Sequence, residues 1–209
     1  MKLETLALYG YLFMATPIAP SQLTFSEYLV YDDGTDNCYE LVDGELVMVP
    51  LPTAEHSDLV DLIRDIFREQ VRLKGYPWLV KSDVGVYTGI NPLSRKDRSR
   101  TPDICVLTQA QWAFLKANQK SPAVLKTPPV LVVEIVSQGS RTTDYESKRT
   151  EYESAKVPEY WIVDLIEQRV TVLTLFEGSY QQQVFTGSDR IATTNFPELE
   201  LTVEQVLSV

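Results

Sequence analysis

The sequence predicts an α/β fold in which a mixed central sheet is flanked by helices and preceded by a β-hairpin. Two alternating runs within residues 39–49 flank Asp43-Gly44, a strong hairpin signal. Residues 54–74 form an amphipathic pattern, which predicts a long helix. The unbroken apolar run at 130–136 indicates a strand buried on both faces at the centre of a sheet.

The remaining elements of the N-terminal half follow from local signals. A short helix is expected at 24–30, capped by Thr24 or Ser26, with a turn cluster after it at 32–37. The long helix begins after its expected N-cap Thr53 and stops at Gly75. Its apolar stripe recurs at spacings of three and four residues and comprises Leu59, Leu62, Ile63, Ile66, Phe67 and Val71. Residues 77–90 predict a strand or a strand pair, and 92–101 a polar, basic loop.

Strands and helices alternate in the C-terminal half. Besides 130–136, strands are expected at 104–107, 159–164 and 169–176. Helices are expected at 109–118, 142–155 and, after a last turn-rich stretch, 202–207; residues 119–129 are a Pro-rich connector. This order indicates a sheet with helices on its faces.

Length and composition favour one domain. The chain has 209 residues, 44% of them hydrophobic and 23% charged, which suits a single core over 24–209 behind an N-terminal extension at 1–23. The extension faintly resembles a secretory signal at 6–15, but Glu4 lies just before that segment and Pro17 and Pro20 follow it. Met14 is an alternative start that would leave the first 13 residues as an ill-ordered extension.

Cysteine usage and hydropathy indicate a cytoplasmic protein. Cys105 lies in an apolar run and Cys38 near a turn, so we expect no disulfide and a reducing compartment. No apolar stretch is long enough to span a bilayer.

The charge balance restricts the function. A net charge of −10 argues against a protein that coats nucleic acid nonspecifically, because phosphate contacts need Lys and Arg. It leaves a nuclease open, since catalytic carboxylates are themselves acidic and bound metal partly cancels their charge. A single histidine and two cysteines exclude most zinc-cluster and Ser-His-Asp schemes.

Two carboxylates lie in or beside apolar strands. Glu134 sits inside the run 130–136, where an ionised carboxylate without a partner would cost several kcal/mol. Asp103 precedes another short apolar strand, and if the two strands are neighbours both carboxylates could hold one hard cation such as Mg²⁺. The alternatives are a structural Glu134 paired with a core Arg or Lys, and an Asp103 that only caps the turn after Pro102.

The next helix presents three polar side chains on one face. Asp144, Lys148 and Tyr152 follow at i, i+4 and i+8, and the helix starts close to the end of the Glu134 strand. Lys148 can therefore return toward the carboxylates, although Asp144 and Lys148 also suit an ordinary surface ion pair.

Together these motifs resemble the Uma-type restriction endonuclease family, part of the PD-(D/E)XK nuclease superfamily. The motifs that carry the resemblance, over residues 24–180, are Tyr39-Glu40-Leu-Val-Asp-Gly-Glu45, Pro52-x-x-Glu55-His56, Pro102-Asp103, Val-Val-Glu134-Ile-Val-Ser, Asp144-x-x-x-Lys148-x-x-x-Tyr152 and Val157-Pro158-Glu159-Tyr160-Trp161-Ile162-Val163-Asp164. The resemblance implies a restriction-endonuclease-like fold and hydrolysis of DNA phosphodiester bonds with Mg²⁺ or Mn²⁺.

The resemblance also implies roles for individual residues. Asp103, Glu134 and the Ile135 carbonyl would bind the metal, and Asp103, Glu134 and Lys148 would be catalytic. The superfamily pattern expects a lysine where this chain has Val136, and Lys148 would take its place. Accessory candidates are Glu40, Glu55, His56, Asp144 and Tyr152, with helix-end packing as the alternative for His56. Candidates for a DNA contact are Arg95, Lys96, Arg98 and Arg100, with a solvated loop as the alternative.

The sequence leads to three hypotheses about function. The first is a Mg²⁺- or Mn²⁺-dependent DNA endonuclease. A homodimer would suit it, since two nuclease sites often cut two strands, although no segment of the sequence identifies a dimer interface. The second is a non-catalytic binding or assembly module on a nuclease fold, which the missing lysine at position 136 and the acidity favour. The third is a metal-dependent phosphoesterase acting on RNA or small nucleotides.

Overall fold

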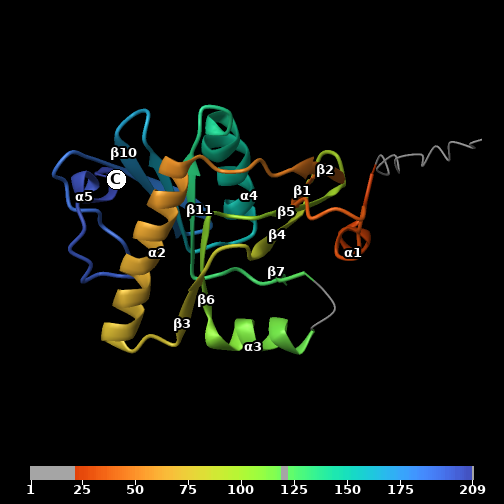
Figure 1. Cartoon of the computed structure of the whole chain (residues 1–209), viewed down its shortest axis with the longest axis horizontal. Helices are drawn as coiled ribbons and strands as arrows, with labels where there is room; N and C mark the ends of the chain where they lie inside the picture. Colours follow the sequence, from red (N-terminus) through yellow and green to blue (C-terminus); the bar gives the residue numbers. More distant parts are fainter. Residues whose placement is uncertain (1–21, 119–121, 209) are drawn as a thin grey trace, which may run out of the picture.

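The computed structural model describes residues 22–118 and 122–208, which form two mixed sheets and their covering helices (Figure 1). The signal-like segment 6–15 and the alternative start at Met14 lie outside the described residues, as does part of the connector 119–129. Sheet A has the strand order β2-β1-β5-β4-β7, and sheet B the order β11-β10-β9-β8-β6-β3.

The strands have the following bounds. Sheet A consists of β1 (Tyr39–Val42), β2 (Glu45–Met48), β4 (Gly85–Ile90), β5 (Asp97–Arg100) and β7 (Val124–Leu125). Sheet B consists of β3 (Trp78–Lys81), β6 (Ile104–Thr108), β8 (Leu131–Val136), β9 (Glu159–Asp164), β10 (Arg169–Phe176) and β11 (Ser179–Thr186). The expected mixed α/β architecture is confirmed, with two sheets in place of one.

Helices lie where local signals predict them. Their bounds are α1 (Phe25–Tyr28), α2 (Ala54–Lys74), α3 (Gln109–Ala117), the π-helix η1 (Thr143–Lys148), α4 (Arg149–Ser154) and α5 (Val203–Leu207). Thr24 and Thr53 cap α1 and α2 as expected, and Gly75 ends α2 in the left-handed region at φ 65°. The predicted helix 142–155 is helical, but its first part is a π-helix.

Three strands differ from the prediction. The prediction of a loop at 92–101 is wrong for its last residues, because they form β5, which lies in sheet A between β1 and β4. The connector contains β7, and the turn-rich stretch after residue 176 contains β11, which pairs with β10 along its whole length. These strands are polar or very short, so apolar alternation does not reveal them. Residues 77–90 form two strands, which belong to different sheets.

Two apolar layers cover the faces of sheet B. One layer joins Leu59, Ile63 and Phe67 of α2 to the sheet and to the segment around α5. The other joins Tyr152 of α4, together with β4 and β7 of sheet A, to the opposite face. Figure 1 shows α2 and α5 on the side of the molecule away from sheet A, and α4 between the two parts. The face beneath α4 is the one that carries the polar site.

Two further findings concern bilayers and cysteines. Within the described ranges, no helix combines the length and hydropathy needed to cross a membrane. Cys38 is exposed, Cys105 is buried, and both are free thiols.

Candidate functional site

The site lies where β6 and β8 run side by side. These strands are antiparallel with Ile104 opposite Val133, and continuing the register by one residue places Asp103 opposite Glu134. Side chains alternate along β8, so Glu134 shares the face of Val132 and Val136, beneath α4. Asp103 lies directly before β6 and Glu134 lies within the adjacent strand β8, so the two carboxylates predicted from sequence come from neighbouring parts of sheet B.

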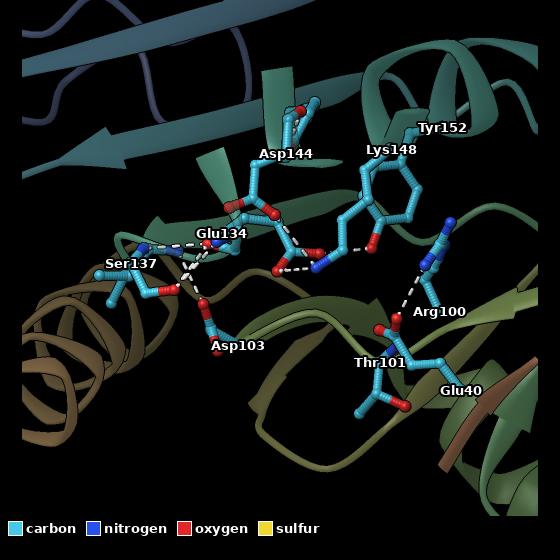
Figure 2. A network of polar contacts seen from close by, with 12 residues as sticks. Glu40, Arg100, Thr101, Asp103, Glu134, Ser137, Asp144, Lys148 and Tyr152 are labelled. Carbon is cyan, nitrogen blue, oxygen red and sulfur yellow. Dashed lines mark hydrogen bonds and ion pairs between the residues drawn. The ribbon is translucent and has the colours of Figure 1, made fainter. Parts of the chain in front are cut away.

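Glu134 is held by two side chains of the overlying helix. It is 2% exposed, accepts a hydrogen bond from the Tyr152 hydroxyl at 2.7 Å and pairs with Lys148 Nζ at 2.8 Å (Figure 2). Burial raises the pKa of Glu134 well above its ordinary value, and the Lys148 ammonium opposes that rise. One alternative for Glu134 was a structural carboxylate paired with a core arginine or lysine. The structure contains such a pair, and Lys148 is the basic partner.

Asp103 is held from two directions. Its Oδ1 lies 3.0 Å from His56 Nε2, and its Oδ2 accepts a hydrogen bond from the Ile135 N–H at 2.7 Å. His56 stands in the first turn of α2, where Thr53 Oγ1 accepts from the His56 N–H at 3.2 Å. The hydrogen bond to Asp103 raises the pKa of His56, although partial burial opposes the rise.

Asp144, in the first turn of η1, is the third carboxylate of the cluster. It is 1% exposed, and Lys148 Nζ lies 3.3 Å from its Oδ1. Neither carboxylate oxygen of Asp144 has a hydrogen-bond partner, and burial raises its pKa. For Lys148, burial alone would lower the pKa, but Glu134, Glu40 and Asp144 raise it overall, so the ammonium stays charged.

A buried arginine connects the hairpin to the same helix. Arg100 binds Glu151 of α4 through Nε at 2.8 Å and Nη2 at 2.6 Å, and Glu40 of β1 through Nη1 at 2.9 Å. Glu40 also accepts from the Thr101 N–H at 2.9 Å, two residues before Asp103. Figure 2 shows Glu40, Arg100 and Thr101 beside the Glu134 cluster. This network ties β1, β5 and α4 together around the site.

The structure brings most of the predicted residues together. The contacts described above link His56, Asp103, Ile135, Glu134, Tyr152, Lys148 and Asp144 in one chain of neighbours. Glu40 joins through Arg100 and Thr101, whereas Glu55 is exposed at the start of α2.

The basic residues 95–100 do not form one exposed loop. Arg98 and Arg100 are buried in β5, and the Arg100 guanidinium is engaged by two carboxylates, which corrects the view of both as loop residues facing DNA. Arg95 is exposed and Lys96 half-buried in the turn between β4 and β5. The sequence interpretation missed Glu151, whose position three residues after Lys148 places it near the same helix face.

The residues present suit a divalent cation of the Mg²⁺ type. Such ions take oxygen ligands, commonly one or two carboxylates completed by water and substrate phosphate. Asp103 and Glu134 supply such carboxylates, and the unpartnered oxygens of Asp144 lie beside them. Within residues 22–118 and 122–208, no group of three or more His, Cys, Asp or Glu side chains is arranged as a ready metal cage. The donor set therefore fits a site that water and substrate complete.

Comparison with known proteins agrees with this architecture. Residues 25–204 match the model of the Uma2 family, described as "Putative restriction endonuclease". Among solved structures, a "putative nuclease belonging to DUF820" from Anabaena variabilis ATCC 29413 has a TM-score of 0.64 and 19% identity, covering 83% of this chain and 92% of that one. No curated protein matches the chain. The family model spans most of the chain, so the chain belongs to the Uma2 family and has the fold of the Anabaena protein.

Proposed function

We propose that this protein is a metal-dependent endonuclease that hydrolyses phosphodiester bonds of DNA. The observation that carries the proposal is the pair Asp103 and Glu134: Asp103 lies directly before β6, Glu134 lies in the adjacent strand β8, and Lys148 pairs with Glu134. Two carboxylates and a lysine at one point are the groups that metal-assisted phosphodiester hydrolysis needs. Membership of a restriction endonuclease family supports the reaction class.

Each residue of the cluster has a role in this proposal. Asp103, Glu134 and the Ile135 carbonyl would hold Mg²⁺ or Mn²⁺. A cation there supplies polarisation of the scissile phosphate and a lowered pKa for a bound water. Lys148 would orient that water or stabilise the charge on the pentacovalent phosphorus.

Two further side chains would keep the carboxylates in place. Tyr152 donates to Glu134 and fixes one of its oxygens. His56 lies against Asp103 and fixes the other carboxylate from the α2 side. Partners of this kind commonly hold metal-binding carboxylates in their productive orientation.

DNA would approach over the turn between β4 and β5. Arg95 and Lys96 lie in that turn, and Lys96 contacts Gln22. Phosphate contacts from a few such residues would position the duplex without reading its sequence. A cytoplasmic homodimer would place two such sites on the two strands.

A nicking assay with supercoiled plasmid tests the proposal. Wild-type protein should nick the plasmid with Mg²⁺ or Mn²⁺ and lose that activity in EDTA. Glu134→Gln removes the anionic ligand at nearly constant shape and should lower the rate by at least about a hundredfold. Glu146→Gln, which changes an exposed glutamate of η1 in the same way, is the matched control and should retain the rate. Equal rates for wild type and Glu134→Gln, or full activity in EDTA, would exclude this assignment.

A non-catalytic module is the second candidate. All four carboxylate oxygens of Asp103 and Glu134 already have a protein partner, which is the arrangement of a structural cluster. Calorimetric titration with Mn²⁺ separates the two functions. A nuclease should bind the ion and lose the binding heat in Glu134→Gln, whereas a module of this kind should show no binding at millimolar Mn²⁺.

A further inference from the structure

Asp144 is the one member of the cluster whose oxygens lack a hydrogen-bond donor. Asp103 has His56 and the Ile135 N–H as partners, and Glu134 accepts a hydrogen bond from Tyr152 and pairs with Lys148 at 2.8 Å. Asp144, whose side chain is 1% exposed, accepts no hydrogen bond and pairs only with Lys148, at 3.3 Å. A buried carboxylate in that state costs free energy, so its position calls for a specific reason. From the sequence, Asp144 is either an accessory site residue or one half of an ordinary i,i+4 ion pair with Lys148, and neither interpretation gives it a specific role.

Lys148 lies between two carboxylates at unequal distances. Its Nζ is 2.8 Å from Glu134 Oε2 and 3.3 Å from Asp144 Oδ1, so a short movement of the ammonium exchanges one partner for the other. The π-helix η1 carries both Asp144 and Lys148. Insertions of this type occur often at functional sites, because they change the direction in which side chains leave a helix.

The ammonium occupies the position on Glu134 that a cation would need. A divalent ion bound to Glu134 would repel Lys148 at that distance, and the side chain is too buried to reach water easily, with 8% exposure. The displaced ammonium therefore needs a second anionic partner inside the protein. The only carboxylate within ion-pair distance of Nζ besides Glu134, among the residues that the structure describes, is Asp144.

We propose that Asp144 is a positioning residue that receives Lys148 when a divalent cation takes its place on Glu134. In the metal-free protein the Lys148 ammonium pairs with Glu134 and balances the charge of its carboxylate. On binding of the ion, Lys148 would leave Glu134 and shorten its existing 3.3 Å contact with Asp144 Oδ1 to a hydrogen bond, and it would stay within the cluster, where it can act on water or phosphate. This inference rests on the proposed function, because it requires Glu134 to bind metal.

A double-mutant cycle measured by Mn²⁺ calorimetry tests the transfer. The proteins are wild type, Asp144→Asn, Lys148→Met and the double variant, each checked for cooperative melting. Asp144→Asn keeps the shape but removes the anionic partner, so it should weaken Mn²⁺ binding on the order of tenfold. In the Lys148→Met background no ammonium has to be received, so the same change should alter binding by less than about twofold.

The outcomes distinguish this inference from the proposed function. An equal loss in both backgrounds would mean that Asp144 binds the ion directly or acts only through its charge, and would overturn the transfer. Absence of Mn²⁺ binding in wild type would remove the proposed function and the transfer with it. If Lys148→Met does not fold, a wild-type crystal structure with Mn²⁺ decides. Nζ should then hydrogen-bond to Asp144 and lie beyond 4 Å from Glu134, while a lysine still on Glu134 contradicts the transfer.

Discussion

Around Glu134, burial and the immediate partners determine the pKa values of the ionisable side chains. Lys148 is charged because three acids surround it, and Glu134 and Asp144 resist ionisation because they are withdrawn from water. The sequence could predict that Glu134 needs a partner, since an isolated buried carboxylate is costly. It could not predict that Asp103 also contacts His56, because that contact depends on how α2 lies on sheet B.

The contact between His56 and Asp103 should make stability depend on pH. The pKa of His56 is raised above its ordinary value in the folded state, so the protonated histidine stabilises the fold. This stabilisation is complete below the unfolded pKa of about 6.5 and disappears as pH rises through the folded value. His56→Gln should therefore lower the free energy of unfolding by about 1 kcal/mol at acidic pH and by much less at alkaline pH.

Urea unfolding of wild type and His56→Gln at pH 5.5 and 8.5 measures this difference. The exposed variant Asp58→Asn, in the same helix, provides a control for a change of charge in α2. A destabilisation of equal size at both pH values would show that protonated His56 makes no additional contribution.

At the scale of elements, the local signals were sufficient for α2 but not for β5. The cap at Thr53, the apolar stripe and Gly75 all lie within the helix or beside it, so its bounds were predicted without tertiary information. Membership of β5 in sheet A depends on Glu40 and Glu151, which lie 60 and 51 residues from Arg100. Distant partners of this kind make a polar segment suitable for a buried strand, and sequence spacing does not reveal them.

The N-cap of α2 should contribute measurably to stability. Thr53 accepts a hydrogen bond from the His56 N–H, which would otherwise lack a partner within the helix. Thr53→Ala should lower the free energy of unfolding by about 1 kcal/mol, and Thr53→Ser should retain most of it. Thermal and urea unfolding of the three proteins provide the measurement, and equal stability of Thr53→Ala and wild type would contradict the expectation.

The Arg100 network should contribute far more to the free energy of unfolding than a surface ion pair does. Arg100→Met leaves Glu40 and Glu151 buried without their common cation, which should cost about 3 kcal/mol or more. Arg72→Met, which removes an exposed pair with Glu69, is the matched control and should change stability by less than about 1 kcal/mol. Similar losses for both variants in urea unfolding would contradict the assigned difference in burial.

At the scale of the whole molecule, an acidic protein presents a small basic turn at its proposed DNA entrance. With a net charge of −10, phosphate contacts must come from a few residues, and the binding constant should fall with salt accordingly. Most strands and helices could be predicted in order from the sequence, but β5, β7 and β11 could not, and the division into two sheets and the pairing of β6 with β8 appear only in the structure. Strand order is set by packing of the whole chain, which local patterns do not encode.

Salt dependence tests the basic turn. For a double variant with Arg95→Ala and Lys96→Ala, the slope of log binding constant against log salt should decrease by about 2 relative to wild type. Arg72→Ala with Lys74→Ala is the matched control, since those residues lie at the far end of α2, about 25 Å from His56 at 1.5 Å per residue. Anisotropy of a labelled duplex gives both slopes, and an unchanged slope in the Arg95 and Lys96 variant would remove this turn from the interface.

The central claim is that Asp103 and Glu134 share one divalent cation. Anomalous scattering from crystals soaked in Mn²⁺ tests it most directly, because it locates the ion without depending on turnover. If the two carboxylates hold the ion together, wild-type crystals should show a peak between them and Glu134→Gln crystals should show none. A wild-type crystal at saturating Mn²⁺ with no peak there would contradict it.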